Sequence, residues 1–336
     1  MMGAVITSVD DYLDSLSEIV GYKSGIALTR DELIGYLAEQ PGLEGIREFD
    51  GKDVLRIRSE VIQDTVVRIL NKLGNTDAKG FMPLGVDLLK KYQNDPKKLE
   101  LLFKVGSMVS HMTVDAIPAA KKPKDKTIDP APIVKAVEEK YGALGALMAC
   151  ETMRNQAEHM HLSFWSRSRL VEWTDTIELK GLFESESLQT SYGHFFDQRY
   201  IDYLFANFDH IDDINWRKFE GLTAEFFSRE GFHCVVGPGR NDGGVDIRVW
   251  PRKEDETMPP MILIQCKRQR DKVSGVVVKA LWADVQHERA ESGLIVTTST
   301  LAPGAETLRK VRSYEIGSAD RKALRQWIQV MRGKTM

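Results

Sequence analysis

The sequence predicts an α+β protein of several domains, in which a mainly helical amino-terminal region with a winged-helix-like start precedes a carboxy-terminal α/β domain. Three observations support this prediction. The 336 residues are about twice the length of a usual domain of roughly 100–150 residues. Apolar residues recur at helical spacing through much of residues 1–214, whereas short strand patterns alternate with helices from residue 232 onward. A proline-rich segment interrupts the helical patterns and marks a boundary.

Composition is typical of an ordinary globular protein. Hydrophobic residues make up 42% and charged residues 28%, and the longest apolar runs are far too short to span a bilayer. The amino terminus has no basic start and no long apolar centre, so it does not resemble a secretory signal. Cys150, Cys234 and Cys266 include no CxxC pair, which excludes a disulfide framework and a thiolate zinc site. We therefore expect a cytoplasmic protein with no membrane contact, in which oxygen or imidazole binds any metal.

Charge is unevenly divided along the chain. Residues 215–336 hold 21 Lys and Arg against 15 Asp and Glu, a balance of +6. Residues 1–214 hold 25 against 34, a balance of −9, and the overall charge of −3 hides this difference. Because fixed cations displace the counterions condensed on a polyanion, the carboxy-terminal part is the one suited to nucleic acid.

The first segment has the signals of a helix followed by a hairpin. Thr29 and Glu32 form a capping box that opens a helix over 33–39, because the hydroxyl and the carboxylate each satisfy an unpaired amide at the helix start. The runs 46–49 and 54–58 flank an Asp-Gly turn and predict the two arms of a hairpin. This order predicts a winged-helix-like unit, for which DNA contact, a protein interface and a plain scaffold all stay open.

Further helices and a linker follow. Residues 84–112 predict two amphipathic helices separated by an Asn-Asp-Pro break, and Pro132 opens a long helix that continues to His159. Between them, proline and lysine predominate, which is typical of an extended linker. We accordingly predict four parts: a winged-helix-like and helical domain over 1–115, a linker over 116–131, a helical connecting region over 132–214, and the carboxy-terminal domain over 215–336.

The carboxy-terminal domain alternates helices with strands. An opening helix is followed by predicted strands over 232–236, 245–250 and 261–267, and a loop with four glycines joins the first two. The third strand is apolar until Gln265 and polar beyond it, as happens where a buried strand emerges into a site. A helix over 276–288, a strand over 293–299 and a helix over 304–311 complete the pattern.

Polar side chains gather at the end of the third strand. Gln265 and Lys267 point to the same face, because side chains alternate along a strand. If the second and third strands pair as a hairpin, Asp246 lies near Gln265. One carboxylate, one amide oxygen and one ammonium are then together.

These groups suit phosphodiester hydrolysis with a divalent cation. Magnesium prefers few protein oxygens and keeps several waters, so the Asp246 carboxylate, the Gln265 side-chain oxygen and the Cys266 backbone carbonyl form a sufficient shell. Lys267 then faces the water. Glu220, on the opening helix, either completes the shell or orients the water. Hydrolysis needs a cation that neutralises charge on phosphorus and a cationic group near the attacking water, and both are provided.

The carboxy-terminal residues resemble the Mrr-like branch of the PD-(D/E)XK nuclease superfamily, the catalytic domain of type IV restriction endonucleases. The resemblance covers about 215–336 and implies a restriction-endonuclease-like fold with a central mixed sheet flanked by helices. It implies that Asp246 binds the metal, that Gln265 replaces the usual acidic ligand, and that Lys267 and Glu220 are the catalytic lysine and the helix glutamate. The implied cofactor is Mg²⁺ or Mn²⁺. The matching motifs are Phe219-Glu220, Gly231-Phe232, Gly243-Gly244-Val245-Asp246-Ile247, Gln265-Cys266-Lys267 and the predicted strand Gly293–Ser299.

The resemblance also implies a function. It implies a DNA endonuclease that restricts foreign or modified DNA, as in antiviral defence, while the amino-terminal region senses a target, a protein partner or a signal. We expect a homodimer, because one site cuts one strand at a time. Two alternatives stay open: a non-catalytic DNA-binding or regulatory protein that retains the fold, and a structure-specific nuclease. The residues expected to contact DNA phosphates beside the site are Arg240, Asn241, Arg268, Arg270 and Lys279.

Overall fold

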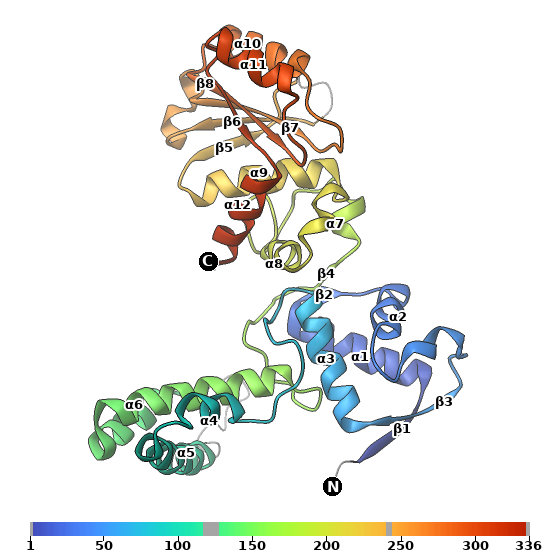
Figure 1. The fold of residues 1–336 in the computed structure, drawn as a ribbon, viewed down its shortest axis with the longest axis vertical. Helices are drawn as coiled ribbons and strands as arrows, with labels where there is room; N and C mark the ends of the chain where they lie inside the picture. The colour runs from blue at the N-terminus through green and yellow to red at the C-terminus, as the bar shows by residue number, and fades with distance from the viewer. Residues whose placement is uncertain (1–2, 117–127, 240–243, 334–336) are drawn as a thin grey trace. The chain divides into compact units, whose positions relative to one another are not determined.

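The computed structural model describes residues 3–116, 128–239 and 244–333 (Figure 1). No helix within these ranges combines the length and the apolar character that a membrane crossing requires. Contacts divide the chain into two compact units. Unit 1 comprises Met1–Lys23, Leu37–Arg68 and Ala78–Glu172, and unit 2 comprises Ser24–Tyr36, Ile69–Asp77 and Trp173–Met336.

Unit 1 combines a two-stranded ribbon with helices. The two predicted amphipathic helices and the long predicted helix are confirmed as α4, α5 and α6. Val105 and Val109 of α5 and Val137 and Met148 of α6 are fully buried in one apolar cluster. The elements are β1 (Ala4–Ser8), α1 (Val9–Ser24), the 3-10 helix η1 (Glu44–Glu48), β3 (Val54–Arg58), α3 (Ser59–Lys72), α4 (Val86–Tyr92), α5 (Pro96–Ala116) and α6 (Ala131–Leu162).

The predicted hairpin is wrong in one arm. Residues 46–48 lie in the 3-10 helix η1, and Phe49 follows its end, so no strand forms there. β3 is confirmed, but it pairs antiparallel with β1, in a register that places Ile57 opposite Val5. β3 has one buried and one exposed face, which is typical of a strand in a sheet. The β-branched residues of β1 favour the strand that pairs with it. The wing is therefore absent from the described residues, and the winged-helix-like start is not confirmed.

The predicted capping box at the start of α2 is confirmed, because the Thr29 amide donates to Glu32 Oε2 at 2.7 Å and the Glu32 amide donates to Thr29 Oγ1 at 3.3 Å.

Unit 2 holds the predicted carboxy-terminal domain. The boundary predicted at 214 stays a prediction, and most of the predicted linker lies outside the described residues. The elements are β2 (Ile26–Ala27), α2 (Arg30–Ala38), β4 (Ile177–Glu178), α7 (Gly181–Glu184), α8 (Gln198–Ala206), the 3-10 helix η3 (Phe208–Asp212), α9 (Trp216–Arg229), β5 (His233–Val236), β6 (Ile247–Trp250), the 3-10 helix η4 (Lys253–Thr257), β7 (Ile262–Lys267), α10 (Gly275–Glu288), β8 (Ser292–Thr297), α11 (Pro303–Val311), β9 (Ile316–Ala319) and α12 (Arg321–Gly333).

A mixed sheet of five strands forms the centre of unit 2. Its order is β5-β6-β7-β8-β9. β5, β6 and β7 pair antiparallel, whereas β7, β8 and β9 pair parallel. The predicted central mixed sheet is therefore confirmed. The strands and helices predicted from residue 232 to residue 311 all form within two residues of their expected bounds.

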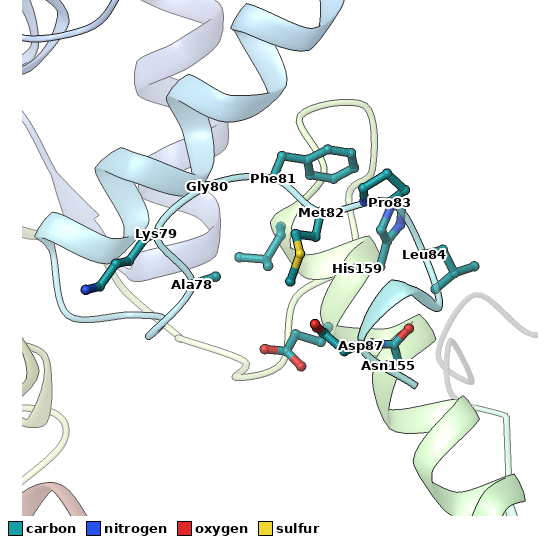
Figure 2. A pocket seen from close by; sticks show the side chains of 12 residues that line it. Ala78, Lys79, Gly80, Phe81, Met82, Pro83, Leu84, Asp87, Asn155 and His159 are labelled. Atoms are coloured by element: carbon teal, nitrogen blue, oxygen red, sulfur yellow. The ribbon is translucent and has the colours of Figure 1, made fainter. Parts of the chain in front are cut away.

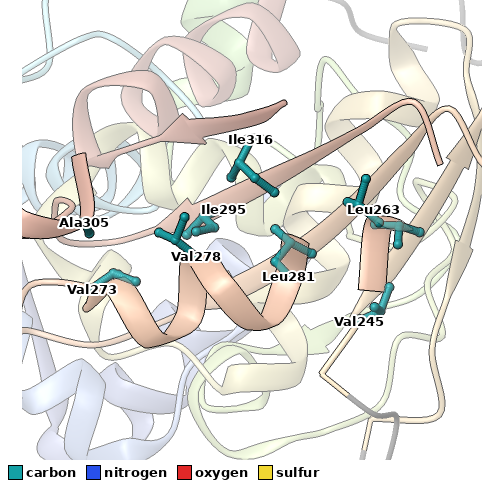
Figure 3. Packing of buried hydrophobic residues seen from close by; sticks show 9 residues of the cluster. Val245, Leu263, Val273, Val278, Leu281, Ile295, Ala305 and Ile316 are labelled. Carbon is teal, nitrogen blue, oxygen red and sulfur yellow. The ribbon is translucent and has the colours of Figure 1, made fainter. Parts of the chain in front are cut away.

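Helices cover both faces of this sheet (Figure 1). On one face, Val278 and Leu281 of α10 pack with Leu263 and Ile295 of the central strands in a buried apolar cluster (Figure 3). On the other face lie α9 and α12, whose Phe226 and Trp327 rings stack at 4.2 Å. Because both faces are covered, the central residues Leu263, Ile264 and Gln265 of β7 and the end of β8 from Ile295 to Thr297 are buried.

Candidate active site

The hairpin of β6 and β7 brings Asp246 to Gln265. The ladder pairs Ile247 with Ile264, so one step further along the antiparallel register places Asp246 opposite Gln265. The Asp246 amide donates to the Ile264 carbonyl at 2.9 Å. Oδ2 of its carboxylate accepts from the Cys266 amide at 2.5 Å. The predicted pairing of the two strands is thus confirmed, and the Asp246 carboxylate lies at the polar end of β7.

Gln265 presents a buried side-chain oxygen beside Asp246. The residue is 7% exposed, and its Oε1 has no hydrogen-bond partner among the described residues. An unsatisfied buried polar group costs about 1–3 kcal/mol. Gly244 leaves the space beside it: its φ is +98°, and a Cβ there would lie 3.3 Å from Gln265 Nε2. The fold therefore places a possible oxygen ligand for a metal ion next to Asp246.

These residues fit a small cation that prefers oxygen ligands. Within the described ranges, no group of three or more His, Cys, Asp or Glu side chains is placed to hold a metal ion. The candidate ligands here are one carboxylate, of Asp246, and one neutral amide oxygen, of Gln265, whose missing partner a cation would replace. Magnesium accepts few protein oxygens and keeps its waters. The predicted Cys266 carbonyl ligand stays a prediction.

Lys267 is the last residue of β7 and is half-buried. Its carbonyl accepts from Thr297 Oγ1 at 2.8 Å and from the Thr298 amide at 3.3 Å, which fixes the strand end. In the part of the chain that the structure describes, no hydrogen bond or ion pair engages its ammonium. Side-chain alternation places it on the face of Gln265, so its cation is available there.

The pKa of the Cys266 thiol depends on the charges around the site. Burial raises its pKa well above the ordinary value, and the negative charge of Asp246 raises it further. Glu220 also raises this pKa, whereas a hydrogen bond with Thr223 and the charge of Lys267 lower it. The thiol is therefore neutral and no nucleophile. All three charged residues predicted for the site lie close enough to act on one sulfur.

Glu220 does not stand alone, because Arg217 holds it. Arg217 Nη1 lies 2.6 Å from Glu220 Oε2, and the two side chains are 15% and 5% exposed. Arg217 Nη2 also donates to the Gly237 carbonyl at 2.7 Å, and the Gly237 amide donates to the Asp246 carbonyl at 2.8 Å. Arg217 thus connects the helix glutamate to the loop and to Asp246. Sequence reasoning missed this residue, although its i,i+3 spacing from Glu220 on a helix was a signal.

The predicted DNA-contact residues are less closely tied to the site. Arg268 Nη1 donates to the Asp212 carbonyl at 2.8 Å, and Arg270 is paired with Asp213 at 3.6 Å. These contacts hold both arginines to the segment before α9. Lys279 is exposed on α10. Arg240 and Asn241 lie outside the described residues.

A hollow in unit 1 contains none of the predicted site residues (Figure 2). Its volume is about 440 Å³, and it lies between the segment 78–87 and α6. The Phe81 and His159 rings meet at 4.9 Å in its wall, and burial lowers the pKa of His159. Asp87 and Glu158 also line it. This mixture of apolar and acidic groups indicates no particular ligand.

The segment that carries these residues matches a known family. Residues 211–328 match the family model Mrr_cat, the restriction endonuclease. The resemblance predicted from the motifs is confirmed over this segment. The match supports a DNA nuclease, which is a hydrolase. It covers about a third of the chain and leaves the residues before 211 unassigned.

Two further similarities were found. Over 117 residues, or 34% of this chain, the sequence is 26% identical to the uncharacterized protein y4cE of Sinorhizobium fredii (strain NBRC 101917 / NGR234), and it spans 30% of that protein's length. The structure of MspJI restriction endonuclease in complex with a 27-mer oligonucleotide aligns over 56% of this chain and 42% of that chain, with 19% identity and a TM-score of 0.30. That score is too low for a comparison of the two folds.

Proposed function

We propose that this protein is a metal-dependent DNA endonuclease whose active site lies where β6 begins and β7 ends. The observation that carries the proposal is the buried Gln265 oxygen, which has no hydrogen-bond partner among the described residues. It lies at the position opposite Asp246, in a domain that matches the restriction endonuclease family. A buried oxygen without a partner is costly unless a ligand completes it. A divalent cation is the ligand that this pair of oxygens suits.

Each residue has a distinct role in this proposal. Asp246 and Gln265 hold Mg²⁺ or Mn²⁺, with the Cys266 carbonyl as the third protein ligand. The ion supplies charge neutralisation and an activated water when it is bound. Lys267 directs its ammonium at the negative oxygens of the scissile phosphate, which stabilises the charge that develops there. Glu220 orients the water, and Arg217 keeps Glu220 in place.

The biological role that we propose is restriction of foreign or modified DNA in the cytoplasm, as in type IV restriction and antiviral defence. The amino-terminal region then senses the target, a protein partner or a signal. Double-strand cleavage requires two sites, so we propose a homodimer. The basic balance of residues 215–336 supports DNA as the substrate. The division of labour between the two parts of the chain rests on analogy between folds.

One observation favours a second candidate, a non-catalytic DNA-binding protein that retains the nuclease fold. Gln265 is neutral and Glu220 is already paired with Arg217 at 2.6 Å, so the site offers a cation less negative charge than two carboxylates would. A protein of this kind binds DNA equally well with and without metal. It also loses nothing when Lys267 is replaced.

The deciding experiment is cleavage of methylated and unmethylated plasmid in Mg²⁺, Mn²⁺ or EDTA. We expect metal-dependent cutting by the wild type and none by Asp246→Ala or Lys267→Ala. The matched control is Glu291→Ala, because this exposed carboxylate precedes β8, at the opposite end of the β7–β8 pair from Lys267. Its cutting should equal that of the wild type. Cutting that survives in Asp246→Ala, or intact DNA binding without cutting under any metal, contradicts the proposal.

A further inference from the structure

The β1–β3 ribbon of unit 1 turns one face outward. Leu55 and Ile57 of β3 are buried, so Arg56 and Arg58, which alternate with them, point away from the core. The register places Arg56 opposite Ile6 and Arg58 opposite Ala4. These four residues are exposed, Ile6 by 71%. We call Ala4, Ile6, Arg56 and Arg58 the ribbon face.

A hollow of about 510 Å³ lies beside the two arginines of the ribbon face. Within the described ranges, neither guanidinium has a hydrogen bond or an ion pair. Residues i and i+2 of a strand are about 6.6 Å apart, so the two cations stand side by side. Glu60 is the acidic residue in the lining, and its Oε2 is buried without a hydrogen-bond partner among the described residues. The lining residues are Gly3, Ala4, Arg56, Arg58 and Glu60.

The chemistry of this surface suits the phosphates of duplex DNA. Arginine presents a planar fork of donors that matches phosphate geometry, and it is weakly hydrated. A two-stranded ribbon is one of the elements that a DNA groove admits. The exposed Ile6, opposite Arg56 on β1, is not part of the core, whereas a DNA groove offers it apolar contact. The acidic balance of residues 1–214 does not oppose this, because phosphate contacts depend on local cations.

We propose that the ribbon face binds duplex DNA, with Arg56 and Arg58 on backbone phosphates. The inference rests on the proposed nuclease function and gives its DNA a contact outside the matched segment 211–328. Phosphate contacts of this kind set position and affinity and carry no sequence information. DNA held here therefore binds with a strength that depends on salt and not on sequence.

The test is equilibrium binding of a short duplex of mixed sequence, in EDTA to prevent cutting, over a range of salt concentrations. Each phosphate contact contributes about 0.9 to the slope of log affinity against log salt. Arg56→Gln/Arg58→Gln should reduce that slope by about 2 and the affinity at about 0.1 M salt by roughly 50-fold. Each single variant should remove about half of the slope change. The matched control is Lys97→Gln/Lys135→Gln, which removes two exposed cations from α5 and α6 of the same unit.

Each outcome is decisive. Slopes and affinities equal to the wild type, or an equal loss in the lysine control, overturn the inference. Binding of ATP that depends on both arginines, with DNA binding unchanged, also overturns it and assigns the hollow to a free nucleotide. Plasmid cleavage in Mg²⁺ separates this failure from failure of the proposed function. If the protein cuts plasmid but the arginine variants bind DNA as the wild type does, the ribbon-face inference alone is refuted. If the arginine variants lower the salt slope of DNA binding but the protein does not cut, the nuclease proposal alone is refuted.

Discussion

Replacing Gln265 with glutamate tests the candidate metal site most directly. The substitution preserves side-chain shape. It turns the amide oxygen, which has no hydrogen-bond partner among the described residues, into part of a carboxylate. Directly opposed side chains of an antiparallel pair have Cβ atoms roughly 4.5–5.5 Å apart. The new carboxylate therefore lies about 5 Å from Asp246, and both positions are less than 9% exposed.

The expected size of the effect follows from this distance. Two like charges about 5 Å apart at an effective dielectric constant of about 20 repel by about 3 kcal/mol. That repulsion raises the pKa of the new carboxyl by about 2 units above its unfolded value of about 4.3. Because the folded pKa is raised, the variant is as stable as the wild type below about pH 4.3 and loses stability as the pH rises through about 6. Above that pH, the domain should melt roughly 6–12 °C lower.

Metal should reverse the sign of this effect. A divalent cation between the two carboxylates replaces repulsion with attraction, so Mg²⁺ should bind the variant roughly tenfold tighter and restore its melting temperature. Thermal unfolding at about pH 5 and about pH 8, with and without Mg²⁺, measures this directly. Gln286→Glu, on the exposed side of α10, is the matched control, and the difference between its melting temperature and that of the wild type should change with neither pH nor Mg²⁺. If Mg²⁺ does not change the melting temperature of Gln265→Glu at about pH 8, the metal site is refuted.

Three further predictions concern named contacts. Arg217→Ala should destabilise the protein by about 3–5 kcal/mol in denaturant unfolding, because it leaves the buried Glu220 carboxylate unpaired, and Glu220→Gln in the same chain should restore most of the loss. Gly244→Ala should cost about 1–2 kcal/mol and weaken metal binding, because φ is +98° and the new Cβ meets Gln265, whereas Gly304→Ala, with open space around it, should cost nothing. Burial lowers the pKa of His161 to about 4, below its unfolded value. This group's contribution to stability is therefore complete above about pH 6.5 and lost as the pH falls, by about 2 kcal/mol between pH 7 and 5, and His161→Asn should remove that loss in unfolding titrations.

The carboxy-terminal domain could be predicted from its sequence because local and global signals agree there. The strand at 261–267 is apolar until Gln265, and its pairing with the strand before it follows from chain order and a short connection. Alternation then placed Gln265 and Lys267 on one face without knowledge of the fold. Asp246 opposite Gln265 is a consequence of register, which is fixed once one face of a strand is buried.

Other features depended on contacts that are distant in the chain. The strand at 54–58 was recognised, but its partner lies fifty residues earlier, at Ala4–Ser8, and competition between near and distant partners is not visible in a local pattern. The pairing of Arg217 with both Glu220 and the Gly237 carbonyl depends on how α9 packs against β5. A sequence displays the spacing of such residues, but not which carbonyl lies within reach.

The charges of the site suggest how metal and DNA depend on each other. In a Lys267→Ala background, Asp246, Glu220 and Arg217 together carry a formal charge of −1, because the arginine balances one carboxylate. A divalent cation held there leaves a net positive charge, and a DNA phosphate neutralises it. Metal and DNA should therefore strengthen each other's binding by the same factor, typically about 5–150-fold. In Gln265→Glu, the extra carboxylate neutralises the cation without DNA, so this coupling should shrink.

Mn²⁺ binding can be followed by electron paramagnetic resonance, with and without a short duplex, in a Lys267→Ala background that does not cut. The measurement gives the factor by which DNA changes the Mn²⁺ affinity, with Gln265 and with Gln265→Glu. Equal Mn²⁺ affinity with and without DNA in both proteins would show that the phosphate does not complete the site.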